Sequence, residues 1–166
     1  MLPPDKRVVV CPGTFDPVTN GHLDVITRAA AMYDQVIVGV VNLPWRKGGT
    51  VFSVEERIQF LANATRDVPN ITVEPFSTLL VDFARAKGAI AILKGLRAIS
   101  DFEYEMEMNQ LNHRQAPEIE SVYLMASDKY SFLSSSGVKE LATFGGDIDE
   151  LVPSEVANAL KERLSR

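Results

Sequence analysis

The chain has 166 residues, the length of one domain, with 17 basic and 22 acidic residues and a formal net charge of −5. Apolar residues make up 46% of the chain and charged residues 23%, and this ordinary composition excludes a disordered, collagen-like or disulfide-rich protein. Because the net negative charge repels DNA and RNA, we expect no nucleic-acid partner, and any bound phosphate needs a local cluster of cations.

Cysteine content and hydropathy limit where the protein works. Cys11 is the only cysteine, so the chain can form neither an intrachain disulfide nor a cysteine-based zinc site, which favours a reducing, cytoplasmic environment. No apolar run approaches the roughly 20 residues that span a bilayer, and residues 1–7 lack the apolar core of a signal peptide. We therefore expect no membrane partner and no export by that route.

Short β-branched runs alternate with longer amphipathic segments along the whole chain, a pattern that requires crossover connections. The predicted strands are mostly apolar, as is typical of strands covered on both faces, and comprise residues 7–11, 35–41, 71–75, 89–94 and 121–125. The predicted helices comprise residues 21–32, 54–65, 78–87, 101–114, 135–144 and 154–164. This order predicts an α/β fold, a Rossmann-like, doubly wound sheet of five parallel strands in a single domain spanning residues 1–166.

Local signals mark two of the helix ends. Ser53, followed three residues later by Glu56, forms the signature of a capping box at a helix start. Gly88 lies where a helix would end in the left-handed conformation that glycine favours. These two boundaries are therefore set by capping chemistry as well as by periodicity.

Ligands of open parallel sheets bind beyond the carboxyl ends of the strands, where the strand order reverses. Four loops are predicted to lie at such places, and they comprise residues 12–22, 42–51, 95–100 and 126–136. We therefore expect the functional residues to lie in these loops.

The first of these loops is tightly turned and leads to a histidine. Two glycines and two prolines lie within residues 12–22, and the next helix is predicted to begin near Gly21. His22 then lies in the first helical turn, where unpaired N–H groups and the helix dipole favour an anion such as phosphate. The residues alone equally allow a loop shaped by glycine and proline, with His22 as a capping or packing residue.

Residues 19–22 read TNGH and resemble the T/HxGH signature of the nucleotidylyltransferase superfamily, which includes the class I aminoacyl-tRNA synthetases. Further segments follow in order, with KGLR at residues 94–97, DFEYE at 101–105, YSF at 130–132 and SSS at 134–136. Together they make the chain similar, from about residue 7 to residue 164, to the bacterial phosphopantetheine adenylyltransferase family.

The resemblance implies transfer of an adenylyl group from ATP to 4'-phosphopantetheine, giving dephospho-CoA and pyrophosphate, the penultimate step of coenzyme A synthesis. Such a transfer needs no protein nucleophile when the acceptor's own phosphate attacks the α-phosphorus in line, so catalysis depends on positioning and charge stabilisation. The chain fits this requirement, since it has two histidines and no recognisable Ser/His/Asp order or G-x-S-x-G elbow.

The resemblance implies a catalytic set that comprises His22, Lys94, Arg97 and Ser136. In this family the residue matching His22 contacts the ATP phosphates and stabilises the transition state. By the same resemblance, Thr14 and Phe15 contact both substrates, Thr14 through its backbone and its hydroxyl.

Two cations of this set are predicted to end the fourth strand. Lys94 and Arg97 turn outward on either side of Gly95, as phosphate binding by an acidic protein demands, although an isolated surface pair is more often simply solvated. The resemblance implies that Lys94 binds the acceptor phosphate and that Gly95, Leu96 and Arg97 bind ATP. Many family members have arginine at the position of Lys94, and lysine keeps the charge but loses the bidentate geometry.

Four carboxylates crowd the start of the helix predicted at residues 101–114, namely Asp101, Glu103, Glu105 and Glu107. Carboxylates there complement the helix dipole, so we interpret most of them as capping residues. We do not predict a metal cage, because Asp101 and Glu105 share one helix face whereas Glu103 and Glu107 take another. The resemblance places only Glu105 near the nucleotide.

The resemblance further implies that one continuous segment contacts ATP, and it comprises Tyr130, Ser131, Phe132, Leu133, Ser134, Ser135 and Ser136. The serine hydroxyls and backbone N–H groups of this segment can cap the following helix or hold the β- and γ-phosphates, and the two roles are compatible. Ser136 is the member of the segment that we expect to be catalytic, with Lys139 one helical turn further on.

The loop at residues 42–51 departs from the family pattern. The family usually has a lysine two residues after a proline, where it contacts the acceptor phosphate, but this chain has about two extra residues after Pro44. Arg46 matches by its distance from Pro44 and Lys47 matches by residue type, and we prefer Lys47. Leu80 matches a family position that lines the pantetheine channel, and it fits a core leucine equally well.

Cofactor and assembly also follow from the resemblance. Magnesium is expected to arrive with ATP, because no protein ligand set is visible and ATP travels as its magnesium complex. Family members are homohexamers that CoA inhibits, so a homohexamer and feedback by CoA are expected. Cys11 and His113 are interpreted as structural residues.

Two other interpretations stay open. The first is an enzyme of the same superfamily that transfers a nucleotidyl group to nicotinamide mononucleotide or to an alcohol phosphate. The second is a non-catalytic module that senses ATP or CoA, and the presence of His22 and Ser136 argues against it, since a sensor needs no transition-state donor. The chain has neither the P-loop motif nor the G-x-G-x-x-G motif.

Overall fold

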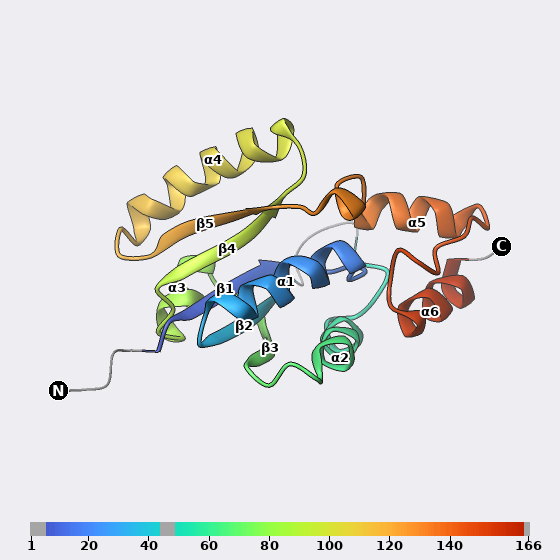
Figure 1. Cartoon of the computed structure of the whole chain (residues 1–166), viewed down its shortest axis with the longest axis horizontal. Helices are drawn as coiled ribbons and strands as arrows, with labels where there is room; N and C mark the ends of the chain where they lie inside the picture. Colours follow the sequence, from blue (N-terminus) through green and yellow to red (C-terminus); the bar gives the residue numbers. More distant parts are fainter. Residues whose placement is uncertain (1–5, 44–48, 165–166) are drawn as a thin grey trace.

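The computed structural model describes residues 6–43 and 49–164. Within these residues, five strands form one parallel sheet in the order β3-β2-β1-β4-β5, as predicted (Figure 1). The strands are β1 (Val8–Gly13), β2 (Gln35–Val41), β3 (Ile71–Phe76), β4 (Ala91–Leu96) and β5 (Glu120–Met125).

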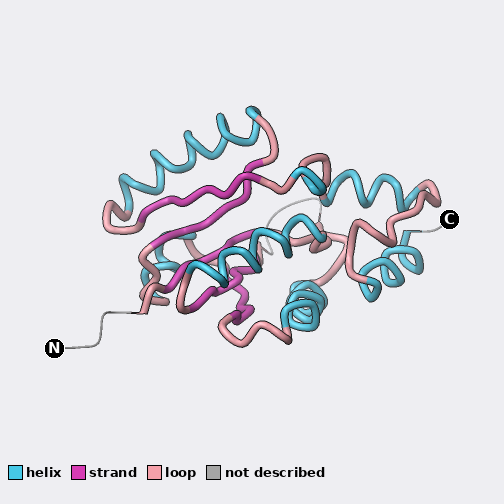
Figure 2. Tube along the Cα trace, in the orientation of Figure 1, coloured by secondary structure: helices cyan, strands magenta, loops and turns pink. Residues whose placement is uncertain are grey.

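All six predicted helices are present (Figure 2). They are α1 (Asn20–Met32), α2 (Val54–Thr65), α3 (Leu80–Ala86), α4 (Ile99–Gln115), α5 (Ser135–Thr143) and α6 (Ser154–Leu164). A single-turn 3-10 helix, η1 (Asp128–Tyr130), was not predicted, because three residues are too few to show a periodic pattern. No described helix is both long enough and apolar enough to cross a bilayer.

The predicted boundary of the fourth strand is wrong. Strand β4 continues to Leu96, so Lys94 and Gly95 are strand residues and only Arg97 lies beyond the strand end. The polar Lys94 does not end the strand, because β5 continues to pair with it and places Tyr123 opposite Lys94. Lys94 and Arg97 therefore do not flank a turn at Gly95.

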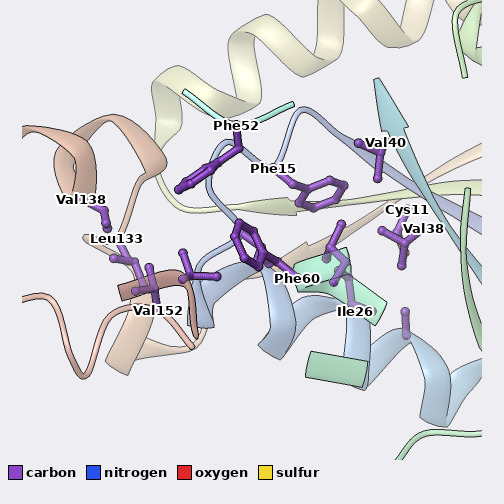
Figure 3. Packing of buried hydrophobic residues seen from close by; sticks show 14 of the residues in the cluster. Cys11, Phe15, Ile26, Val38, Val40, Phe52, Phe60, Leu133, Val138 and Val152 are labelled. Atoms are coloured by element: carbon purple, nitrogen blue, oxygen red, sulfur yellow. The ribbon is translucent and has the colours of Figure 1, made fainter. Parts of the chain in front are cut away.

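The alternation of side chains along the strands supplies one core to each face of the sheet. Val9 and Cys11 of β1 belong to a cluster with helices α1, α2, α5 and α6, whereas Val8 and Val10 pack on the opposite face with α3. Figure 3 shows part of the larger cluster, in which Cys11 is buried as a structural residue. Helices thus cover both faces, as expected of a doubly wound fold.

Two helix boundaries follow the predicted capping chemistry. The Ser53 N–H donates to Glu56 Oε2 at 2.8 Å, and the Glu56 N–H donates to Ser53 Oγ at 3.2 Å. These reciprocal bonds confirm the capping box at the start of α2. Gly88 has a φ of 65°, which confirms the left-handed position after α3.

The topology determines where a ligand can bind. From β1 the chain adds β2 and β3 on one side and then returns to place β4 on the other side of β1. The strand order therefore reverses between β1 and β4, and the carboxyl ends of these parallel strands share one edge of the sheet. Helices α5 and α6 lie toward this end of the molecule, at the right of Figure 1.

Candidate active site

A cavity of about 570 Å³ lies where the first loop, the end of β2 and the starts of α2 and α5 meet. Five residues that the sequence predicts for the site line it, and they are Thr14, Phe15, His22, Ser135 and Ser136. Asp16, Arg57 and Lys139 also line it and add charged groups to the wall. The cavity thus joins the loop after β1 to the serine segment, which lies more than a hundred residues later in the chain.

His22 is both a capping residue and a wall of this cavity. The Thr19 N–H donates to His22 Nδ1 at 3.0 Å, and the His22 N–H donates to Thr19 Oγ1 at 3.3 Å. A backbone N–H can only donate, so Nδ1 accepts and the proton of the neutral ring is assigned to Nε2. The cap therefore selects the tautomer that leaves an Nε2–H donor for a ligand.

The surroundings of His22 keep its ring neutral. Burial, followed by the nearby positive charge of Arg97, lowers the pKa of His22 from 6.5 to about 4. The Phe15 ring packs edge-on against the imidazole, with 5.1 Å between ring centroids and 78° between ring planes. At neutral pH the site therefore presents a held, uncharged hydrogen-bond donor.

Phe15 lines the cavity with little of its side chain. The residue is only 5% exposed and its ring belongs to the core, near Ile26 and Phe60 (Figure 3). The backbone φ of Phe15 is 52°, in the left-handed region that residues other than glycine rarely adopt. A Cβ on Gly13 would lie 2.8 Å from the Phe15 ring, so glycine at position 13 is what allows this packing.

The two predicted phosphate-binding cations lie outside this cavity wall. Lys94 Nζ is 2.8 Å from Glu105 Oε2, and Arg97 Nε is 3.2 Å from Asp101 Oδ2. Arg97 Nη1 also donates to the Leu133 carbonyl at 2.8 Å, which connects β4 to the serine segment. The predicted catalytic set is therefore divided, with two members in the cavity and two on the β4 side.

Helix α4 supplies the carboxylates that hold these cations. Asp101 and Glu105 are half-buried and each pairs with a cation, whereas Glu103 and Glu107 are exposed. The predicted division of the four acids between two helix faces is confirmed. Asp101 also accepts the Arg97 N–H at 3.1 Å, but Arg97 lies one residue before the N-cap Ala98, and α4 begins without a side-chain cap hydrogen bond.

The three consecutive serines have three different environments. Ser134 is the N-cap of α5 and accepts the Gly137 N–H at 3.0 Å. Ser135 Oγ donates to the Pro17 carbonyl at 2.8 Å and so ties α5 to the first loop. Ser136 is exposed at the cavity and has no hydrogen bond to another described side chain.

Other residues predicted to bind ATP are in positions that favour backbone contacts or packing. The side chains of Leu96 and Leu133 are buried, so the groups they can offer a nucleotide are backbone groups. A Cβ on Gly95 would lie 2.9 Å from Val25 Cγ2 of α1, which gives this glycine a packing role. Phe132 is 71% exposed and lines a separate apolar cavity beside α5.

The remaining predicted residues have varied positions. Ser131 Oγ donates to the Asp128 carbonyl at 3.1 Å, and Tyr130 packs partly against the core. Leu80 packs against the cluster on the α3 face and is not part of the cavity wall. His113 is exposed near the end of α4.

The two predicted loop cations, Arg46 and Lys47, lie outside the described residues.

Sequence reasoning missed two charged residues of the wall, Asp16 and Arg57. Arg57 is 3% exposed and donates to the carbonyls of Thr14, Val41 and Phe52. The available signal was its position, because a residue three and four places before Phe60 and Leu61 lies on the apolar face of the helix. A charged residue on that face needs partners, and the sequence could not show which ones.

We compared the chain with known protein families and with curated proteins of known name. Residues 10–141 match the cytidylyltransferase-like family. The chain is 52% identical over 157 residues to the phosphopantetheine adenylyltransferase of Moorella thermoacetica, an alignment that covers 95% of this chain and 97% of that protein. The chain belongs to the phosphopantetheine adenylyltransferase family. The family member of Thermodesulfovibrio yellowstonii is 50% identical, with the same shares of both chains covered.

Solved structures share the fold at much lower sequence identity. A bifunctional NMN adenylyltransferase/ADP ribose pyrophosphatase from Francisella tularensis superposes with a TM-score of 0.69 at 19% identity, covering 95% of this chain and 49% of that one. A putative nicotinate-nucleotide adenylyltransferase from Vibrio parahaemolyticus has a TM-score of 0.68 at 13% identity, covering 95% and 93%. These likenesses confirm the predicted Rossmann-like α/β fold.

Proposed function

We propose that this protein transfers the adenylyl group of ATP to 4'-phosphopantetheine and releases dephospho-CoA and pyrophosphate, the penultimate step of coenzyme A synthesis. The substrates follow from the activity for which the family members at 50–52% identity are named. The observation on which the chemistry rests is His22, whose capped Nδ1 leaves Nε2–H as a donor in a cavity shared with Ser136.

The transfer is a direct displacement. An oxygen of the acceptor's 4'-phosphate attacks the α-phosphorus of ATP, a new P–O bond forms, and the bond from that phosphorus to the pyrophosphate oxygen breaks in line. His22 donates its Nε2–H to the negative charge that develops on the α-phosphate oxygens. Because the ring stays uncharged, it supplies a directed hydrogen bond, and positive charge is left to cations such as Arg97 and Lys94.

The remaining residues divide between the two substrates. Lys94 binds the phosphate of the acceptor, 4'-phosphopantetheine. Thr14 and one loop cation, Arg46 or Lys47, contact the same substrate, and Leu80 lies beside the pantetheine arm of that substrate. Arg97 and Ser136 hold the ATP phosphates. Thr14 and Phe15 contact both substrates, and the other nucleotide contacts are those of Gly95, Leu96, Glu105, Tyr130, Ser131, Phe132, Leu133, Ser134 and Ser135.

Magnesium enters as part of the substrate. Within residues 6–43 and 49–164, no three His, Cys, Asp or Glu side chains gather into a group that could hold a metal ion. The proposed ion arrives in the MgATP complex, because ATP travels as its magnesium complex, and it would neutralise charge on the departing pyrophosphate.

The rest of the proposal concerns the whole protein. Residues 1–166 act as one nucleotidylyltransferase domain in the cytoplasm, the protein assembles as a homohexamer, and CoA inhibits it. The surface of α4 supports self-association, since this 17-residue helix has no buried residue and exposes Ile99, Phe102, Tyr104, Met106 and Leu111. An exposed apolar surface of this kind is typical of an interface.

The experiment that tests the function uses the purified protein with MgATP and one acceptor at a time. We expect pyrophosphate release with 4'-phosphopantetheine and none with nicotinamide mononucleotide or glycerol 3-phosphate. Release with another acceptor alone would assign the protein to a different reaction of the superfamily. Binding of ATP without pyrophosphate release from any acceptor would instead support the sensing module.

A further inference from the structure

Arg57 is a buried cation whose partners are backbone carbonyls. Its Nη1 donates to the Thr14 carbonyl at 2.7 Å and to the Val41 carbonyl at 2.9 Å, and its Nε donates to the Phe52 carbonyl at 3.3 Å. Thr14 belongs to the first loop, Val41 ends β2, and Phe52 precedes α2. One side chain therefore ties together three segments that meet at the cavity.

Asp16 of the first loop also binds the segment that precedes α2. This carboxylate is 5% exposed, and it accepts the Val51 N–H at Oδ2 and the Phe52 N–H at Oδ1, both at 2.9 Å. Phe52 is thus held through its N–H by Asp16 and through its carbonyl by Arg57. Lys139 Nζ of α5 lies 3.3 Å from Asp16 Oδ2 and neutralises part of its charge.

The chemistry of the position requires arginine. A planar guanidinium has five N–H donors in a rigid fork and can serve three carbonyls at once, whereas a lysine ammonium is a compact point charge on a flexible stem. The charge is costly at this place, because burial lowers the pKa of Arg57 while the charge of Asp16 opposes that shift only in part. A well-packed apolar residue often stabilises a fold as much as a buried charge does, so general stability alone does not account for arginine here.

The geometry points to Arg57 as a positioning residue for the acceptor side of the cavity, and this inference rests on the proposed function. Val41 and Thr14 line the cavity together with Asn42 and Thr50, on the wall that does not include the serine segment. By bonding to the carbonyls of Thr14, Val41 and Phe52, Arg57 sets the positions of these described residues relative to one another. The serine side is attached to the first loop by the bond from Ser135 to the Pro17 carbonyl and by the pair of Lys139 with Asp16, and neither contact involves Arg57.

The test is the response of the two Michaelis constants to Arg57→Lys, measured with each substrate varied in turn. We expect the KM for 4'-phosphopantetheine to rise about tenfold and the KM for ATP to change less than about twofold, because small displacements of a binding group have large effects. A purely structural role would reduce the amount of active enzyme, and so kcat, and leave both KM values unchanged. That result would overturn the inference.

A matched control is Arg85→Lys. Arg85 Nη2 donates to a backbone carbonyl, that of Gln115, at 3.1 Å, and Arg85 pairs with Glu118, at the edge of the sheet away from the cavity. We expect neither KM to move in this variant. A comparable rise in the KM for 4'-phosphopantetheine would show that the effect is not specific to the cavity and would also overturn the inference.

A second variant keeps the test decisive when Arg57→Lys does not fold. Asp16→Asn retains the side-chain shape and one acceptor oxygen but loses the second acceptor for the Val51 and Phe52 N–H groups. Calorimetric titration should show that this variant binds 4'-phosphopantetheine about threefold or more weakly. Titration with MgATP should show no weakening, because Lys139 keeps its positive charge when it loses the Asp16 carboxylate. Unchanged binding of the acceptor would contradict the inference. Wild-type protein that releases no pyrophosphate would contradict the proposed function alone, since the titration needs no turnover.

Discussion

The two sides of the site are held in different ways. On the side of the first loop, charged and polar side chains bond to the backbone. Arg57 donates to three carbonyls, Asp16 accepts two N–H groups, and His22 accepts the N–H of Thr19. These partners belong to the main chain and have no alternative position while the fold is intact.

On the β4 side, the cations bond mainly to side chains. Lys94 pairs with Glu105 and Arg97 pairs with Asp101, both carboxylates of α4. A substrate phosphate offers the same charge and the same oxygen acceptors as a carboxylate, so it can take the place of these partners. The difference indicates that the first side is formed before substrate binds, whereas the cations of the second side exchange partners when it binds.

The largest expected effect on catalysis comes from the first-loop side of the site, where we expect no other group to replace the His22 donor. His22→Ala removes the Nε2–H donor and should lower kcat about 100-fold, with a smaller change in the KM for either substrate. The measurement is the steady-state rate of pyrophosphate release. His113→Ala, at the exposed end of α4, is the control and should leave the rate unchanged. An unchanged kcat in His22→Ala would show that the capped imidazole does not act in the transition state.

The second prediction concerns pH and the same histidine. The pKa of His22 is about 4 in the folded protein and 6.5 when unperturbed, so the unfolded chain binds more protons between these two values. Folding stability is therefore lost as pH falls from 6.5 to about 4, by about 2 kcal/mol after allowance for the partial exposure of the ring. Urea unfolding of wild type and His22→Gln across this range should show a larger loss in the wild type. The difference between the two losses is the contribution of His22, because carboxylates such as Glu56 titrate in both proteins.

Equal pH dependence in the two proteins would contradict this prediction. It would mean that the imidazole is as accessible to protons in the folded protein as in the unfolded chain. The ring would then be charged below pH 6.5, and the contrast between a formed side and an exchangeable side would lose its main support.

The third prediction tests exchange on the β4 side. Lys94→Gln should raise the KM for 4'-phosphopantetheine about tenfold. The substitution removes the positive charge that is proposed to leave Glu105 and bind the acceptor phosphate. Glu105→Gln should have the opposite sign and lower that KM about twofold, since Lys94 then has no carboxylate partner to give up. Steady-state kinetics with the acceptor varied measures both. If Glu105→Gln instead raised the KM for 4'-phosphopantetheine, Lys94 and Glu105 would act together in binding the acceptor. Lys94 would then not exchange Glu105 for the substrate phosphate.

Most of the fold could be predicted from the sequence because its signals are local. Apolar runs, capping residues and glycine positions located every strand and every longer helix to within two residues at each end. The boundary error with consequences was that of β4, which continues two residues past Lys94 because β5 pairs with it. Strand pairing is a contact between distant segments, and no local pattern near Lys94 could show it.

The site was predictable only in part for the same reason. Motifs located the loop of His22 and the serine segment, which the structure brings to one cavity. Arg57 and Asp16 escaped prediction because, apart from the bond between Arg57 and Phe52, their backbone partners lie 16 to 43 residues away in the sequence. A charged residue on an apolar helix face marks such a position but does not identify its partners.

The smallest expected effect comes from a solvent-exposed contact of Arg163 on the first-loop side of the site, and it is an effect on stability. Arg163 of α6 donates to the Val51 carbonyl at 2.9 Å and to Glu56 Oε1 at 2.8 Å, next to the segment that Arg57 and Asp16 hold. Both members of this ion pair are more than a third exposed, so water and salt screen it. Arg163→Ala should lower the melting temperature by only about 1 °C at neutral pH and should leave both KM values unchanged.

The pH dependence separates this contact from that of His22. Hydrogen bonding to Arg163 lowers the pKa of Glu56 from 4.5 to about 2, so the stability it contributes is present above pH 4.5 and is lost as pH falls toward 2. The small difference between wild type and Arg163→Ala should therefore persist between pH 6.5 and 4.5, where the effect of His22 develops. A difference that instead disappears within that range would mean that Glu56 gains little from Arg163, and that the buried partners alone hold the segment.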